Sequence, residues 1–374
     1  MLNRIRQISA LGQAIWLDYI SRDLLHSGEL ARLVDEGITG VTSNPTIFHK
    51  AITGSTIYDD DIRDLIRRDA TASEIYETLT LADIAAAADV LRPVYNETHG
   101  RDGFVSLEVN PHLAHDTAGT IAEARRLFHA LGRPNVMIKV PATEAGLPAI
   151  ATLIGEGINV NVTLIFALDM YDRVMEAYLE GLRKLQSTGR PLGLVSSVAS
   201  FFVSRIDTLT DRVLEHRIRH GEEHLEPLCG LAAVASAKLA YARYKAVFEG
   251  PRFHEFRVAG ARPQRPLWAS TSTKNPKYPP TKYVDPLIGV NTVNTVPPQT
   301  LEALRAQAIV AQTVEDGLPQ AEALMTQFAG LQIDMKWITN CLLEEGVHAF
   351  IDSFDQLLAD IEKKRAAMQT AARV

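Results

Sequence analysis

The chain has 374 residues, of which 46% are hydrophobic and 22% are charged, and its formal net charge is −7. This balance is typical of a globular protein, and without a dense run of Lys and Arg we expect no nucleic-acid partner. No stretch is apolar enough to span a membrane, and the N-terminus lacks the pattern of a secretory signal. Cys229 and Cys341 lie far apart without CxxC spacing, which disfavours disulfides and structural zinc. We therefore expect a cytoplasmic protein that does not bind membranes.

Segments typical of strands and helices alternate along the chain, which predicts a parallel sheet. The predicted strands are 14–19, 38–42, 104–109, 136–140, 157–166, 192–198, 266–272 and 289–296. The predicted helices are 21–36, 58–95 in two pieces with Thr71 or Ser73 as an N-cap, 116–131, 143 onward, 167–186, a helix containing Arg205, and 220–248. Eight strands without an intervening linker favour a single (β/α)₈ barrel domain over 1–374. Beyond about 300 the chain is mainly helical, and we expect this segment to pack on the outside of the barrel.

Lys139 occupies an unusual position in the fourth predicted strand. The apolar run 136–138 ends on this lysine, Pro141 then prevents the ladder from continuing, and a helical pattern opens at Thr143. The C-terminal ends of strands are where (β/α)₈ barrels carry their chemistry. A lone lysine at a strand end is more often merely solvated, so the hypothesis depends on the other strand ends.

Polar side chains do converge at the predicted ends of the other strands. They are Asp18, Asn44, Glu108, Asn161, Thr163, Ser197 or Ser200, and Ser270. The set lacks a metal-ligand pattern, a phosphate loop and a nicotinamide fingerprint. An amine among carboxylates suits Schiff-base chemistry on a carbonyl substrate, and we expect Lys139 to be substantially neutral rather than locked to Glu108. The alternative is that Asp18 and Glu108 are a structural pair that holds Lys139 by charge.

Five segments, in order, resemble the transaldolases, specifically the longer bacterial type. They are Gly40-Val-Thr-Ser-Asn-Pro-Thr-Ile-Phe48, Ser106-Leu-Glu-Val-Asn-Pro-His-Leu-Ala-His-Asp116, Val136-Met-Ile-Lys-Val-Pro-Ala-Thr-Glu-Ala-Gly146, Gly157 to Phe166, and Ala199-Ser-Phe-Phe-Val-Ser-Arg-Ile-Asp207. The resemblance extends from Asp18 to about Val296. It implies a transferase of the pentose phosphate pathway that moves a dihydroxyacetone unit from sedoheptulose 7-phosphate to glyceraldehyde 3-phosphate, with phosphosugar substrates and no cofactor or metal.

The resemblance also implies roles for individual residues. Lys139 would form the imine, Asp18 would be the general acid/base, and Glu108 would activate a water that Thr163 helps to hold. The substrate-binding residues would be Asn44, Asn161, Ser200, Arg205, Ser270 and Lys274. Lys274 stands where shorter relatives have arginine, and an ammonium cannot clamp two phosphate oxygens in a plane. The alternative for Arg205 is an arginine on a helix surface beside an acidic neighbour, which is the commoner situation for a typical arginine.

Several alternatives remain open from the sequence. A fructose 6-phosphate aldolase would share the scaffold, although such aldolases are shorter and lack the glutamate that Glu108 represents. A catalytically silent barrel that binds phosphosugars is another reading. His216, His220 and His224 recur every fourth residue and could hold a metal on one helix face, but Gly221 interrupts that helix. A monomer and a homodimer both fit the sequence.

Overall fold

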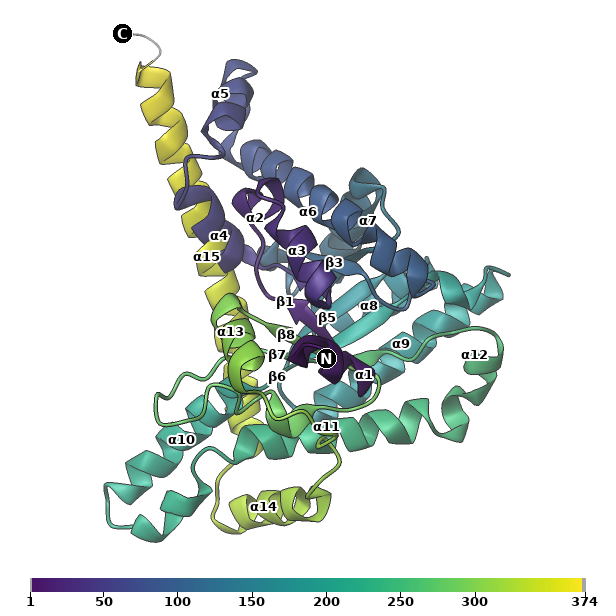
Figure 1. Ribbon diagram of the computed structural model, residues 1–374, viewed down its shortest axis with the longest axis vertical. Coiled ribbons are helices and arrows are strands. Elements are labelled where there is room, and N and C mark those ends of the chain that lie inside the picture. The colour runs from purple at the N-terminus through teal and green to yellow at the C-terminus, as the bar shows by residue number, and fades with distance from the viewer. Residues whose placement is uncertain (1, 372–374) are drawn as a thin grey trace.

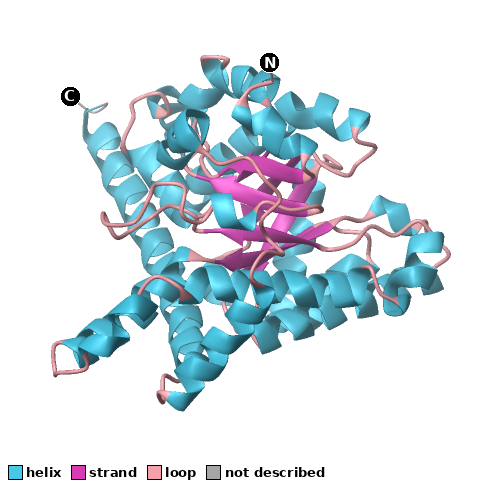
Figure 2. Ribbon diagram, turned by 60° about the horizontal axis from the view of Figure 1, so that its bottom comes forward, coloured by secondary structure: helices cyan, strands magenta, loops and turns pink. Residues whose placement is uncertain are grey.

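Eight parallel strands form a closed barrel at the centre of the computed structural model, which describes residues 2–371 (Figure 1). Each strand pairs with its neighbours in chain order, and β8 returns to pair with β1. The strands are β1 (Gln13–Leu17), β2 (Ile38–Thr42), β3 (Phe104–Glu108), β4 (Val136–Pro141), β5 (Val160–Ile165), β6 (Ser197–Phe202), β7 (Arg265–Ala269) and β8 (Thr292–Val296). Helices surround them on all sides in the view of Figure 2. The predicted (β/α)₈ barrel is thus confirmed.

The strands are short and almost wholly buried, because the barrel interior covers one face and the helices cover the other. Gly40 on β2 shows how tightly this core is packed. A Cβ at this position would lie 2.5 Å from the indole of Trp16 on β1, so only glycine fits. Seven predicted strands overlap the observed ones closely.

The sixth strand lies further along the chain than the predicted range 192–198. Residues Leu192–Leu194 form the 3₁₀ helix η2, and β6 begins only at Ser197. The apolar run at 192–195 follows Pro191 and contains Gly193, residues that favour a turn over a strand. The serines of β6 are buried because neighbouring strands satisfy their hydroxyls, as when Ser197 donates to the Val160 carbonyl at 2.7 Å.

The helices follow the strands, with several short additions. They are α1 (Arg4–Ala10), α2 (Arg22–His26), α3 (Glu29–Glu36), α4 (Pro45–Thr53), α5 (Asp59–Arg67), α6 (Ala72–Glu97), α7 (Thr117–Leu131), α8 (Gly146–Gly155), α9 (Leu168–Ser187), α10 (Ser204–Ile218), α11 (Ala232–Phe248), α12 (His254–Val258), α13 (Pro298–Gln307), α14 (Leu318–Gly330) and α15 (Met335–Ala371). Thr71 is the N-cap of α6 and forms a full capping box with Glu74.

Between β7 and β8 the only helical turn is η5 (Asp285–Leu287), so residues 270–291 form a long loop. Among residues 2–371, no helix is long and apolar enough to cross a membrane.

The helical segment beyond 300 packs in two different places. Helix α14 lies against α11 on the outside of the barrel. Helix α15 instead crosses the C-terminal ends of the strands, and its full length is visible in yellow in Figure 1. Ser353 lies 2.8 Å from Thr46 of α4 through their hydroxyls, and His112 after β3 lies 2.8 Å from Asp355. The helical segment beyond 300 therefore covers the end of the barrel as well as its side.

Candidate active site

A cavity of about 590 Å³ opens at the C-terminal ends of the strands. Of the residues predicted as site residues, those on its wall are Asp18, Asn44, Lys139, Thr163, Ser200, Arg205, Ser270 and Lys274. Glu108 and Asn161 are not on the wall. Both lie directly behind it, in contact with residues that are. The size suits a small-molecule substrate.

Lys139 lies on β4 between two strands that carry polar side chains. It pairs in register with Glu108 of β3 and with Asn161 of β5. Its side chain is 6% exposed, and Nζ donates to the Ser43 carbonyl at 3.0 Å and to Glu108 Oε2 at 3.3 Å. The ring of Phe350 lies 5.8 Å from Nζ. The amine therefore sits in a nearly dry environment at the wall of the cavity.

The two carboxylates near Lys139 are held in different ways. Asp18 follows β1, and its Oδ1 accepts a hydrogen bond from the Thr42 hydroxyl at 2.8 Å. Burial raises the pKa of Asp18, although the charge of Lys139 and the Thr42 hydrogen bond oppose this rise. Burial likewise raises the pKa of Glu108 against the influence of Lys139. Two carboxyl groups of raised pKa thus flank one amine.

Glu108 Oε2 accepts a hydrogen bond from the Lys139 amine. Burial raises the pKa of Glu108, which favours the protonated carboxyl at this position. The expectation that the Lys139 amine is substantially neutral stays a prediction.

Polar groups on β5 and β6 form the wall beside the amine. The hydroxyl of Ser200 donates to Asn161 Oδ1 at 2.7 Å, and Asn161 Nδ2 donates to the Ser106 hydroxyl at 3.0 Å. Asn161 therefore holds Ser200 in place. The buried hydroxyl of Thr163 has no hydrogen-bond partner among residues 2–371. A buried polar atom of this kind beside a cavity is suited to bind water or substrate.

Backbone strain marks two of the strand ends. Leu164, which follows Thr163, has a φ of 59°, and Ser270 after β7 has a φ of 53°. Left-handed backbone at a non-glycine residue is costly and tends to occur at functional sites. The Ser270 hydroxyl lies 3.0 Å from that of Ser204 at the start of α10. Asn44 caps α4 by accepting from the Ile47 N–H at 3.0 Å, which leaves its amide nitrogen available to a ligand.

Cations gather at the other end of the cavity. Arg205 lies in the first turn of α10, and burial lowers its pKa. Burial and the nearby Arg205 also lower the pKa of Lys274, which donates to the Ser272 hydroxyl at 2.6 Å. Within residues 2–371, neither Arg205 nor Lys274 has a carboxylate at ion-pair distance. Lys50 of α4 adds a third positive charge. This end is therefore suited to an anion such as phosphate.

The cavity also contains residues that the sequence reasoning missed. Thr42 and Thr295 share a hydrogen bond of 2.6 Å beside Asp18. Thr42 is the last residue of β2 and Thr295 the next-to-last of β8, so the strand pattern could have identified them. Lys50 and Phe350 come from helices whose positions no local pattern reveals. The three spaced histidines do not share a helix face, because α10 ends at Ile218 and His224 lies in a separate 3₁₀ helix. No metal-binding cluster of His, Cys, Asp and Glu was found in the described part of the chain.

The chain is similar to proteins of one family along almost its whole length. A family model described as Transaldolase/Fructose-6-phosphate aldolase matches residues 15–361. Transaldolase 2 of a Nostoc species is 45% identical, over 97% of this chain and 98% of that protein. The transaldolase of Thermobifida fusca is 47% identical, with 97% and 98% covered. That of Mycobacterium bovis is 45% identical, with 98% and 97% covered.

Proposed function

The chain belongs to the transaldolase/fructose-6-phosphate aldolase family, and we propose that it acts as a transaldolase through a Schiff base on Lys139. It transfers a dihydroxyacetone unit from sedoheptulose 7-phosphate to glyceraldehyde 3-phosphate, which yields erythrose 4-phosphate and fructose 6-phosphate. The observation that carries the mechanism is the contact of the buried Lys139 amine with Glu108, beside a cavity whose far end is cationic.

The first step forms the imine. The neutral amine of Lys139 attacks the ketone carbon of the donor to give a carbinolamine. The Glu108 carboxyl then supplies a proton to the departing hydroxyl, through a water held by Thr163, so that water leaves and an iminium remains. The raised pKa of Glu108 fits this role, because the group must hold a proton before the step.

Asp18 acts as the general acid/base when the carbon–carbon bond breaks and forms. Its carboxylate takes the proton of the hydroxyl on the carbon beyond the bond to be broken. The bond electrons move into the iminium, an enamine forms on Lys139, and the first aldose leaves. The aldehyde of the acceptor then takes up the enamine carbon, and the Asp18 carboxyl returns its proton to the new oxygen. Hydrolysis of the second iminium releases the product ketose.

The remaining cavity residues would bind the substrate. Asn44 and Ser200 would contact the dihydroxyacetone unit, with Asn161 behind Ser200, while Arg205 and Lys274 would bind the phosphate with Ser270 beside them. Arg205 can offer its donor fork to two oxygens, and Lys274 adds a point charge. The absence of an ion-pair partner for either cation among residues 2–371 supports this assignment.

Reductive trapping tests the proposal directly. The enzyme is mixed with fructose 6-phosphate, treated with borohydride and digested, and the masses of its peptides are measured by mass spectrometry. We expect a reduced dihydroxyacetone adduct on the peptide that contains Lys139 and none on Lys139→Ala. Lys238 is a buried lysine that donates to the carbonyls of Thr313 and Asp316, and its peptide is the internal control. An unmodified Lys139 would exclude the Schiff-base mechanism and favour a silent phosphosugar-binding barrel.

The aldolase function shares the family description and needs a separate test. An aldolase releases free dihydroxyacetone from fructose 6-phosphate over many turnovers without an acceptor. We expect no more than one equivalent per active site here, because the enamine on Lys139 should persist until an acceptor aldehyde arrives. Sustained release would favour the aldolase function.

A further inference from the structure

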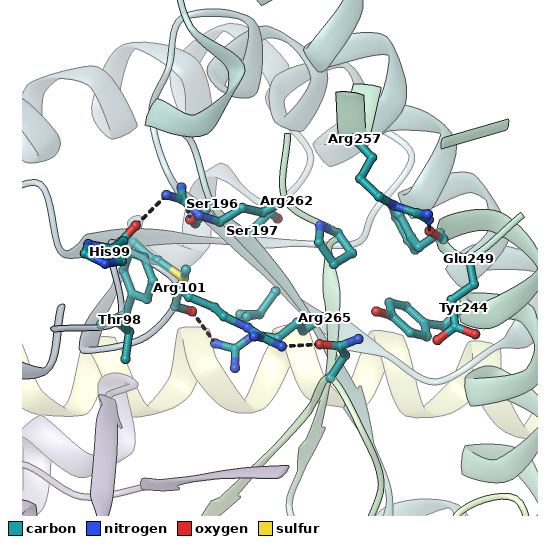
Figure 3. A pocket seen from close by; sticks show the side chains of 16 residues that line it. Thr98, His99, Arg101, Ser196, Ser197, Tyr244, Glu249, Arg257, Arg262 and Arg265 are labelled. Atoms are coloured by element: carbon teal, nitrogen blue, oxygen red, sulfur yellow. Dashed lines mark hydrogen bonds between the residues drawn. The ribbon is translucent and has the colours of Figure 1, made fainter. Parts of the chain in front are cut away.

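A second cavity, of about 470 Å³, lies at the opposite end of the barrel, where the strands begin, and Figure 3 shows the side chains that line it. Its floor includes Phe104, Met137 and Val198, at or near the starts of β3, β4 and β6. Side chains two positions apart on a strand face the same way. The residues two positions further on are Ser106, Lys139 and Ser200, which belong to the catalytic end. The two cavities therefore lie at opposite ends of one barrel interior.

Four arginines line this second cavity: Arg101, Arg257, Arg262 and Arg265. Glu249 is the acidic residue on the wall, and Asp102 lies beside Arg265, 3.4 Å from its guanidinium. Asp102 also accepts from the indole N–H of Trp16 at 2.8 Å. Four guanidinium groups against two carboxylates leave an excess of positive charge. Such an excess in an enclosed space attracts anions.

Two of the arginines have evident structural roles. Arg262 donates to the carbonyls of His99, at 2.6 Å, and Gly193, and so ties together two loops that precede strands. Arg265 is buried, and it donates to the Arg101 carbonyl at 3.0 Å. These contacts fix the shape of the cavity and account for both side chains.

The other two arginines make fewer hydrogen bonds, one each, and Arg257 also lies over the ring of Phe253 at 5.9 Å. Arg101 and Arg257 are exposed residues from different segments, before β3 and in α12. Arg101 donates to the Asn291 side chain at 2.5 Å, and Arg257 donates to the Phe248 carbonyl. Each guanidinium therefore keeps most of its five donors free. In the described residues no carboxylate pairs with Arg101, Arg257 or Arg262, although carboxylates pair with many other arginines of this chain.

From this geometry we infer that the cavity is a second binding site, for a small phosphorylated anion. Guanidinium forks match phosphate oxygens in pairs, and the fixed Arg262 and Arg265 would form a base on which Arg101 and Arg257 close. The volume accommodates a diphosphate or a small phosphate ester but not a macromolecule. The site is independent of the Schiff-base chemistry and does not rest on it.

Pyrophosphate is the probe, and calorimetry is the measurement. All proteins carry Arg205→Ala, which weakens any binding of the probe by the cations of the catalytic cavity. Arg101→Ala/Arg257→Ala is compared with Arg63→Ala/Arg67→Ala, which removes the same charge from exposed arginines of α5. We expect saturable binding that the first pair of changes weakens at least tenfold and the second pair leaves within twofold. Equal affinities, or no saturable binding to Arg205→Ala itself, would overturn the inference.

Chemical labelling of the unaltered protein gives a second test that needs no variant to fold. Phenylglyoxal modifies accessible guanidinium groups, and peptide mass gives the rate at each arginine. We expect pyrophosphate to slow the labelling of Arg101 and Arg257 several-fold and to leave Arg63 unchanged. Equal rates with and without pyrophosphate at Arg101 and Arg257 would contradict the inference.

Discussion

Asp207 joins three parts of the molecule at a buried position behind the cationic end of the cavity. It lies in the first turn of α10, two residues after Arg205, and is 1% exposed. Its carboxylate accepts from the Ala233 N–H at 2.7 Å and from the Tyr283 hydroxyl at 2.9 Å. The second bond holds the loop that carries Lys274. Burial raises the pKa of Asp207 to about 6 in spite of these hydrogen bonds.

The sign of the effect on stability follows from this shift. The folded-state pKa of about 6 lies above the ordinary value of 3.8, so the folded protein holds this proton more tightly than the unfolded chain does. The stability that Asp207 contributes is therefore fully present below about pH 4 and is lost as the pH rises through 6. A shift of this size corresponds to about 3 kcal/mol.

Asp207→Asn removes the ionisation and keeps the shape. The new Oδ1 can still accept from the Ala233 N–H, and Nδ2 can donate to the Tyr283 oxygen. We expect the free energy of unfolding of the variant, relative to the wild type, to rise by up to about 3 kcal/mol between pH 4 and pH 7.5. Urea unfolding followed by circular dichroism at several pH values measures this difference. Asp352→Asn, which removes the same charge from an exposed position, is the matched control.

A difference between wild type and Asp207→Asn that is the same at pH 4.5 and pH 7.5 would refute the reasoning. The reasoning would also be refuted if Asp352→Asn reproduced the pH-dependent change in the free energy of unfolding, because net charge would then be the cause. Comparison of the two variants separates the buried carboxyl from the other titrating groups, which all three proteins share.

Three further predictions concern catalysis. Glu108→Gln should lower kcat by about 10²-fold or more, because a carboxamide cannot pass a proton; unchanged borohydride trapping rates would count against this role. Arg205→Ala should raise KM for phosphorylated donors by roughly 10- to 100-fold through loss of charge-assisted hydrogen bonds, whereas KM for an unphosphorylated ketose should be unaffected. Phe350→Ala should admit water above Lys139 and lower kcat about tenfold, with Phe350→Leu near wild type because it keeps the apolar cover; an unchanged kcat in Phe350→Ala would show that the cover is dispensable.

The sequence predicts the barrel well where short apolar runs end on polar residues. Lys139 and Glu108 were found because a charge inside such a run is costly and therefore conspicuous. The limits of β6 were missed because its serines are satisfied only by neighbouring strands, which a linear pattern does not show. Asn161 was expected at the C-terminal end of its strand but is the second residue of β5, and its position behind Ser200 depends on the closed barrel.

The residues that the sequence reasoning missed share a physical reason. Lys50 and Phe350 reach the cavity from helices. The periodicity of a helix sequence identifies its apolar face but does not show which element that face packs against. The arginines of the second cavity were also missed, because they come from the loop before β3, from α12, and from the loop and first residue of β7. Tertiary structure alone determines such neighbours.

The crossing of α15 over the strand ends has a consequence during synthesis. Phe350, which lies over the Lys139 amine, follows it by 211 residues in the chain. At ordinary translation rates this separation corresponds to about 10 to 40 s. The nascent barrel can thus gather its strands while the amine still faces solvent. The part of the cavity wall that α15 supplies is thus synthesised last, after all eight strands.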